Sequence, residues 1–233
     1  MRKIFIDGGA NEGQSTDKWI KYMSGSNEFE IYMIEPQKSC KQILKDVMEK
    51  YKDYHIEYLP KVIWNNSTDV LPMYHSNNKC TESAGVIFKK TNHTKEHKAE
   101  TLHLSEWIRD NFNPSDYIVL KLDIEGSEYK VIEDLYRTET LSYINEIHGE
   151  LHGVKKSYNI NDDLKLITRL KEYNLNLWHW NGNNDRFKKS YYTDETTERE
   201  HKKWEKRDGL KPNWVKLEQY RNNYEEWYSE NMV

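Results

Sequence analysis

The chain has 233 residues, of which 32% are charged and 36% hydrophobic, and its formal net charge is −4. This near-neutral balance gives no general attraction to nucleic acid or to an anionic membrane, and no apolar run is long enough to span a bilayer. Aromatic residues make up 13% of the chain, which argues against disorder. Two cysteines, Cys40 and Cys80, are too few for a disulfide framework or a cysteine-based zinc site. Since the sequence begins without a secretory leader, we expect a soluble, cytoplasmic protein.

The first half of the sequence alternates short apolar runs with amphipathic stretches. Runs that predict strands lie at 3–6, 31–34 and 55–59, the last leading into 61–64. Stretches that predict helices lie at 16–23 and 40–51, where apolar residues recur at helical spacing.

Residues 65–83 are polar and rich in turn formers, and they predict a loop, while 84–88 predict an extra strand. Three histidines follow in a stretch rich in Thr and Lys: His93, His97 and His103. We interpret that stretch as an exposed polar loop rather than a metal site.

The second half continues the alternation. Strands are predicted at 117–122, 144–151 and 175–180, and helices at 104–111, after Ser127 as N-cap and after Asn161 as N-cap. Strands alternating with helices at this spacing indicate βαβ units. The sequence therefore predicts an α/β fold with a mostly parallel sheet and helices on both faces.

The end of the chain differs in composition, and we place a domain at 1–185 and a helical, aromatic-rich extension at 186–233. Aromatic and apolar residues recur there at helical spacing: Trp214, Leu217, Tyr220, Tyr224 and Trp227. This stripe either packs on the domain or forms an aromatic wall over a substrate pocket.

The turn after the first strand carries ligand-binding chemistry. Asp7 ends the strand, and Gly9 and Gly13 allow a tight turn and close approach of a ligand to the backbone. The spacing is not that of pyrophosphate binders, and an acid here would repel a phosphate but attract an ammonium group. Glu35 ends the second strand, where a carboxylate can accept the hydroxyls of a ribose. An amino group and a ribose without a phosphate indicate S-adenosylmethionine.

A second acidic motif follows the strand at 117–122. Asp123, Glu125 and Glu128 place three carboxylates within six residues at the expected carboxyl edge of the sheet, where open α/β sheets bind their ligands.

Three segments resemble the FkbM family of S-adenosylmethionine-dependent methyltransferases. They are FIDGGANEGQST at 5–16, IEP at 34–36 and VLKLDIEGSE at 119–128, and they occur in family order and at family-like spacing. The resemblance spans about residues 3–180. One departure is Gly8, where the family usually has an aliphatic residue.

The resemblance implies a Rossmann-like class I methyltransferase fold, with a seven-stranded sheet whose last strand is antiparallel. It implies that the first loop surrounds the methionine end of the cofactor, that Glu35 holds the ribose, that the loop after Trp64 flanks the adenine, and that Asp123 lies beside the sulfonium. The implied cofactor-binding residues are Asp7, Gly9, Ala10, Asn11, Gly13, Ser15, Thr16, Glu35, Pro36, Trp64 and Asp123. Family members mostly methylate hydroxyl groups of sugars or of glycosylated and polyketide-type metabolites.

A hydroxyl acceptor needs a base to take its proton or a metal to acidify it. Alternation along 144–152 places Glu150 and His152 on one face, at the edge where Asp123 also emerges. We expect His152 or Glu150 to be the base, with Asp123 orienting the substrate. A second hypothesis is that Asp123, Glu150 and His152 bind a divalent cation, and a third is that the histidines are structural.

The leading hypothesis is an O-methyltransferase acting on a hydroxyl of a sugar, glycan or glycosylated metabolite. A nucleic-acid methyltransferase is disfavoured because the chain lacks a basic stripe. A non-catalytic carbohydrate-binding domain that keeps the fold is another alternative, and the complete cofactor motif argues against it. A nicotinamide-dependent oxidoreductase is less favoured still, because the phosphate-binding glycine pattern is missing. We expect a small-molecule or glycan substrate, and neither nucleic acid nor a membrane as partner.

Overall fold

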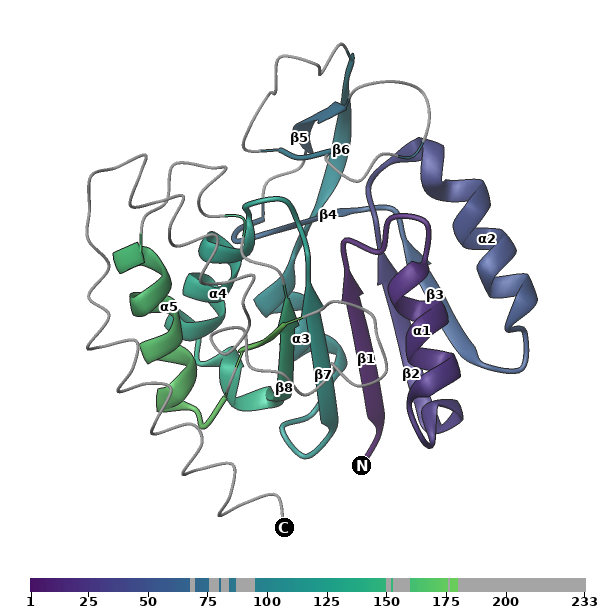
Figure 1. Ribbon diagram of the computed structural model, residues 1–233. Helices are drawn as coiled ribbons and strands as arrows, with labels where there is room; N and C mark the ends of the chain where they lie inside the picture. Colours follow the sequence, from purple (N-terminus) through teal and green to yellow (C-terminus); the bar gives the residue numbers. More distant parts are fainter. Residues whose placement is uncertain are drawn as a thin grey trace.

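The computed structural model describes residues 1–67, 70–75, 80, 84–86, 95–149, 152, 160–175 and 177–179. Figure 1 shows the arrangement of the helices and strands. The strands of this part of the chain are β1 (Lys3–Gly8), β2 (Phe29–Ile34), β3 (His55–Leu59), β4 (Val62–Trp64), β5 (Val70–His75), β6 (Lys95–His103), β7 (Tyr117–Leu122), β8 (Ile144–Gly149) and β9 (Leu177–His179). The α-helices are α1 (Gln14–Tyr22), α2 (Lys41–Lys50), α3 (Leu104–Asn111), α4 (Glu128–Arg137) and α5 (Ile160–Glu172), with short 3₁₀ helices at Ser26–Glu28, Lys38–Cys40 and Thr140–Tyr143.

The main sheet has the order β3-β2-β1-β7-β8, and the three-residue β9 extends it beyond β8. Every pairing in it is parallel, and β1 sits at the centre, with Ile6 opposite Tyr32 on one side and Leu120 on the other. Starting from β1, the strands β2 and β3 follow one another toward one edge of the sheet, whereas β7, β8 and β9 follow one another toward the other edge. The α/β class with a mostly parallel sheet is therefore confirmed. The predicted antiparallel seventh strand and the extension at 186–233 lie outside the described residues.

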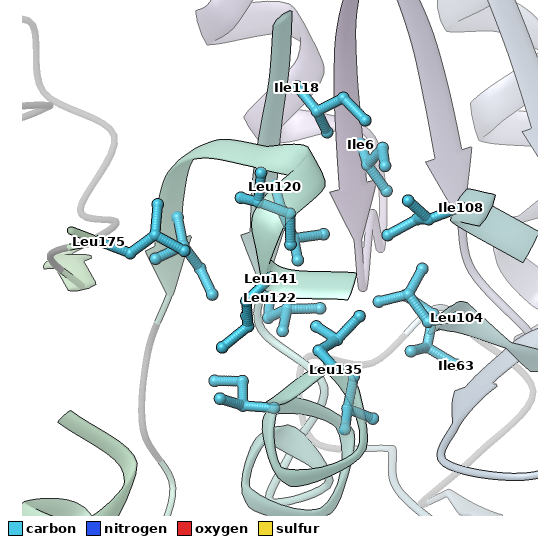
Figure 2. Close-up of a cluster of buried hydrophobic side chains, with 14 of the residues drawn as sticks. Ile6, Ile63, Leu104, Ile108, Ile118, Leu120, Leu122, Leu135, Leu141 and Leu175 are labelled. Carbon is cyan, nitrogen blue, oxygen red and sulfur yellow. The ribbon is translucent and has the colours of Figure 1, made fainter. Parts of the chain in front are cut away.

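Alternating side chains of the central strands build two separate hydrophobic cores. On one face Ile4 and Ile6 pack with residues of α3 and α4, including Ile108 and Leu135 (Figure 2). On the other face Phe5 stacks on Trp19 of α1, with ring centroids 4.2 Å apart, in a cluster that also contains Leu44 of α2. Helices thus cover both faces (Figure 1).

A smaller mixed sheet with the order β4-β6-β5 stands at the carboxyl ends of the main strands (Figure 1). It corrects two expectations, because β5 lies within the predicted loop at 65–83 and His97 and His103 lie on β6 rather than in a loop. The side chains of β6 are largely polar, but each of its residues has a strand partner, since β5 pairs with residues 95–100 and β4 with residues 101–103. Small apolar side chains from these strands, with Ala84, form a third core: Val62, Met73, Ala84 and Ala99. His93 and residues 87–88 of the predicted extra strand lie outside the described residues, and Gly85 makes an isolated antiparallel bridge with Tyr74.

Several boundaries differ from their predictions by one or two residues. Strand β8 ends at Gly149, and α5 begins at Ile160, so Asn161 is not its N-cap. Ser127 does occupy the N-cap position of α4, but its side chain makes no capping hydrogen bond. Among the described helices, none combines the length and the apolar character needed to cross a lipid bilayer.

Cys40 and Cys80 are joined by a disulfide, which closes a loop across a sequence separation of 40. A single disulfide agrees with the expectation that two cysteines cannot form a disulfide framework. The amino-acid composition alone did not predict that these two cysteines would pair. Disulfides are rare in the cytosol, so the bridge does not favour the cytoplasmic location expected above.

Candidate active site

The carboxyl ends of β1, β2 and β7 meet around one small cavity. Four of the residues predicted to bind the cofactor line it together: Gly9, Glu35, Pro36 and Asp123. The opposite wall comes from the small sheet and the segment that follows β5: Val62, Ile63, Met73, Ala84, Gly85 and Val86. The cavity therefore lies at the point of the sheet where α/β folds place ligands, between strands whose chain order reverses.

Glycine is required at the start of the first loop by the neighbouring strand. Gly9 has φ of 75°, and a Cβ there would lie 2.0 Å from the carbonyl oxygen of Asp123. A Cβ at Gly8 would lie 2.7 Å from Cδ1 of Ile63 and 2.8 Å from the carbonyl oxygen of Lys121. The departure from the family pattern at Gly8 thus has a packing reason. The two glycines let the first loop lie directly against the end of β7.

Asp7 lies beneath this loop and is fully buried. Its Oδ2 accepts a hydrogen bond from the hydroxyl of Thr16 at 2.8 Å, and its Oδ1 lies 3.2 Å from Nζ of Lys121. Burial opposes the charge of Lys121, yet the carboxylates of Asp7 and Asp123 raise its pKa above the ordinary value. The sequence analysis assigned the Asp7 carboxylate to the ammonium group of the cofactor. In the structure this carboxylate already has two partners within the chain, Thr16 and Lys121.

Lys121 links Asp7 to the first loop. Its ammonium group also donates to the carbonyl oxygens of Gly8 at 3.2 Å and Gly9 at 2.8 Å. Asp7 consequently acts on the loop from below, by holding the lysine that fixes these carbonyls. Sequence reasoning named Asp7 but missed Lys121, although a lysine in an otherwise apolar strand was the available signal.

Glu35 is buried at the end of β2 and is oriented by the backbone. Its Oε2 accepts from the amide of Asn11 at 3.0 Å, and its Oε1 accepts from the amide of Gln37 at 2.9 Å. Burial raises the pKa of Glu35, while these two amides favour the charged carboxylate. The Gln37 side chain makes a third hydrogen bond to this carboxylate. A carboxylate has about four acceptor sites, so one remains for a ribose hydroxyl.

The other predicted cofactor residues lie around the loop rather than on the cavity. Ala10, Ser15 and Thr16 are buried, and Gly13 packs against Val47 of α2. Trp64 lies under the ammonium group of Lys130, 5.0 Å from its ring centroid, and does not line the cavity. Lys61 and the next two residues, Val62 and Ile63, face the cavity instead of Trp64.

Beside the cavity, three carboxylates surround the imidazole of His152. Nε2 of His152 lies 3.8 Å from both Asp123 and Glu125, and Nδ1 lies 3.1 Å from Oε1 of Glu128. Although burial disfavours the imidazolium, Glu128, Asp123 and Glu125 together raise the pKa of His152 to about 9. At neutral pH this histidine is therefore protonated and held as part of a buried ion cluster.

Glu128 organises this cluster. Its two oxygens accept hydrogen bonds from the amides of Ile124 and Gly126, both at 2.8 Å, so it closes the turn that carries Asp123. That turn is strained, because Glu125 has φ of 55°. Strained backbone of this kind is concentrated at functional sites.

Two of the three residues predicted to be catalytic can be located in the structure. Asp123 and His152 come together as expected, while Glu150 lies outside the described residues. Glu125 and Glu128 occupy the positions around His152, and the sequence analysis noted both carboxylates without giving either a role. Their signal was the spacing of the acidic motif, which places them on the same turn as Asp123.

The cluster also contains a candidate set of metal ligands. One ligand atom each from Asp123, Glu128 and His152 lies within 4.8 Å of the others. A metal binds the neutral imidazole, so its binding would displace the proton that the carboxylates hold on His152. Glu128 would contribute an oxygen that also accepts from a backbone amide.

Comparison with known protein families gives a match that covers most of the chain. The family described as the methyltransferase FkbM domain matches residues 7–176. The matched segment contains the first loop, Glu35 and the whole acidic cluster. Neither the comparison with curated proteins nor that with solved structures gave a match.

Proposed function

The chain belongs to the FkbM methyltransferase family, and we propose that it is an S-adenosylmethionine-dependent O-methyltransferase. Its acceptor is a hydroxyl group of a sugar, a glycan or a glycosylated metabolite. The observation that carries the proposal is the convergence of Gly9, Glu35 and Asp123 on one cavity. These residues come from three different strand ends, and each was assigned to the cofactor from the sequence alone.

The cofactor supplies a methyl group on a sulfonium, which is already activated for displacement by an oxygen nucleophile. Glu35 accepts a hydrogen bond from a ribose hydroxyl, and the carbonyls fixed by Lys121 shape the loop over the remainder of the molecule. Once the cofactor and the acceptor hydroxyl are bound, most of the rate acceleration comes from holding the two reacting groups in the right position.

The acceptor hydroxyl still has to lose its proton. His152 does not suit this task at neutral pH, because its pKa is raised to about 9. The side chain of Asp123 is 34% exposed and faces the cavity, so it can reach a hydroxyl group there. We assign the proton acceptor to Asp123, with His152 as the cation that holds it in place.

The direct test is methyl transfer by the purified protein, measured as S-adenosylhomocysteine released with a panel of glycosides and nucleotide sugars. Asp123→Asn is expected to bind S-adenosylhomocysteine and to lose about 10²–10⁴-fold in turnover, the usual contribution of a general base. Asp110→Asn, an exposed carboxylate on α3, is the matched control and keeps full activity.

Two results would separate the parts of the proposal. Calorimetry that detects no binding of S-adenosylhomocysteine to the folded, dithiothreitol-reduced protein would overturn the cofactor assignment. If the protein binds S-adenosylhomocysteine but methylates none of the hydroxyl acceptors, the cofactor assignment stands and the proposed sugar substrate class is rejected.

A further inference from the structure

The disulfide lies against the candidate cofactor site. Cys40 is fully buried at the end of the 3₁₀ helix that follows Glu35 and Pro36. Cys80 is partly exposed, and its Sγ lies 3.1 Å from Oδ1 of Asn11 in the first loop. The bridge therefore connects the segment after β2 to the chain between β5 and Ala84.

Described residues that precede and follow Cys80 in the sequence line the cavity. Met73, Ala84, Gly85 and Val86 form one wall, which we call the cover. Two backbone hydrogen bonds between Tyr74 and Gly85, of 3.0 and 3.1 Å, hold the cover together. Only residues 81–83 separate Cys80 from Ala84 in the sequence, so the disulfide restrains the cover covalently.

The covered cavity is too small for a nucleoside. Its volume is about 40 Å³, whereas pockets that hold molecules of this size measure about 300–1,000 Å³. Gly9, Glu35 and Asp123 belong to the closely packed turns of the main sheet, and Met73 of the cover is held on β5. Ala84, Gly85 and Val86 belong to no strand, so this part of the cover can move. Binding of a ligand to these residues requires the cover to open.

We propose that the Cys40–Cys80 disulfide is a redox-controlled latch that keeps the cover closed. The inference rests on the proposed function only for the identity of the ligand that enters. With the bridge intact, the segment after β2 and the cover are tied together, and the cavity stays closed. With the bridge reduced, the cover moves independently and admits the cofactor.

Reduction uses a dithiol, either a small molecule or a protein with two neighbouring thiols. One of its thiolates attacks Sγ of Cys80, the more accessible sulfur, and the bond to Cys40 breaks, leaving a thiolate that takes up a proton. The second thiol then displaces Cys80, so the dithiol is oxidised to a disulfide and the protein gains two thiols. The new thiol of Cys80 has an S–H group and can donate a hydrogen bond to Oδ1 of Asn11 in the first loop, which the disulfide cannot.

The first test measures binding of S-adenosylhomocysteine to the oxidised and the dithiothreitol-reduced protein, by calorimetry and by stopped-flow association. If the latched form opens about 10% of the time or less, reduction lowers the apparent Kd by about tenfold or more. Cys80→Ser is the matched control: it binds like the reduced protein and does not respond to dithiothreitol. Equal affinity and equal association rates in the two redox states would overturn the latch.

The second test does not depend on the ligand. Hydrogen exchange of the amides of Tyr74 and Gly85 is expected to be faster in the reduced protein and in Cys80→Ser than in the oxidised protein, and faster than the exchange of the amides in β1 and β7, which follows global unfolding. Unchanged exchange at Tyr74 and Gly85 would refute the latch whatever the binding data show. Faster exchange without any binding of S-adenosylhomocysteine would instead refute the proposed cofactor and leave the latch.

Discussion

At the scale of single residues, the pair formed by Asp7 and Lys121 is the most consequential feature of the site. Both side chains are buried, and together they fix the carbonyls of Gly8 and Gly9. Removing one partner of a buried ion pair leaves an uncompensated charge, which typically costs about 3–5 kcal/mol.

We therefore expect Lys121→Met to lower the free energy of unfolding by about 3–5 kcal/mol, as measured by urea denaturation. The double variant Asp7→Asn with Lys121→Met removes both charges and is expected to recover part of this loss. If the double variant is as unstable as the sum of the two single variants, the residues are not coupled and the pair does not organise the loop.

His152 makes the stability of the protein depend on pH. Its pKa is raised to about 9 in the folded state, and an unfolded histidine titrates near about 6.5. The folded chain thus binds a proton that the unfolded chain has lost between these values. The stabilisation is fully present below pH 6.5 and disappears as the pH rises to about 9, and it amounts to roughly 3 kcal/mol.

Urea denaturation at pH 6, 7.5 and 9 tests this expectation, with His152→Gln as the reference because it lacks the titrating group. The difference in stability between wild type and His152→Gln is expected to shrink steadily over this range. A constant difference would mean that the three carboxylates do not hold His152 as a cation.

At the scale of elements, the periodic spacing of apolar residues was sufficient to predict the helices and strands that pack in or on the main sheet. Strand β7 and helix α2 show this, because an element buried on a defined face has to repeat its apolar residues with that period. Strands β5 and β6 escaped prediction because the small sheet has only a minor core, so the sequence of β6 carries little alternation. The disulfide depends on a contact between residues 40 positions apart, which local patterns do not report.

The candidate site followed the same rule. Residues placed at strand ends, such as Glu35 and Asp123, were found from the sequence because parallel strands bring their carboxyl ends to one edge. Lys121 and Glu128 were missed as functional residues because their roles depend on which backbone groups lie within reach. Those distances exist only after the turns have folded.

The turn between β1 and α1 gives a prediction at this scale. Gly9→Ala combines a left-handed backbone with a Cβ placed 2.0 Å from the Asp123 carbonyl, whereas Gly25→Ala has a similar φ of 72° and approaches only the flexible Glu28 side chain, at 3.3 Å. We expect Gly25→Ala to cost about 1–2 kcal/mol and to leave the affinity for S-adenosylhomocysteine unchanged.

Gly9→Ala is expected to cost more, because β7 and the first loop must separate, and to weaken binding by about tenfold or more, which corresponds to 1.4 kcal/mol. Thermal unfolding and calorimetry of the two variants provide the comparison. Equal effects of the two substitutions would mean that the contact with β7 is not what requires glycine at this position.

At the scale of the whole molecule, the disulfide belongs to one of the two cores on the faces of the main sheet. Cys40 is a fully buried member of the cluster that contains Phe5, Trp19 and Leu44, and Cys80 packs against it, whereas the cluster with Ile6, Ile108 and Leu135 contains neither cysteine. A reduced Cys40 would still fill its place in the core as a small hydrophobic side chain. The fold is therefore expected to survive reduction, as the latch requires.

Reduction nevertheless removes a restraint on the unfolded chain. For a loop closed across 40 residues, the chain-entropy relation gives a loss of about 4 kcal/mol in the free energy of unfolding. We expect dithiothreitol and Cys80→Ser to lower stability by similar amounts in urea denaturation, with the far-ultraviolet circular dichroism of the native state unchanged. Dithiothreitol is expected to cause no further loss of stability in Cys80→Ser, because this variant has no disulfide to reduce. Loss of the native spectrum on reduction would show that the bridge holds the fold itself, and a latch that opens only the cover would then be physically inconsistent with the protein.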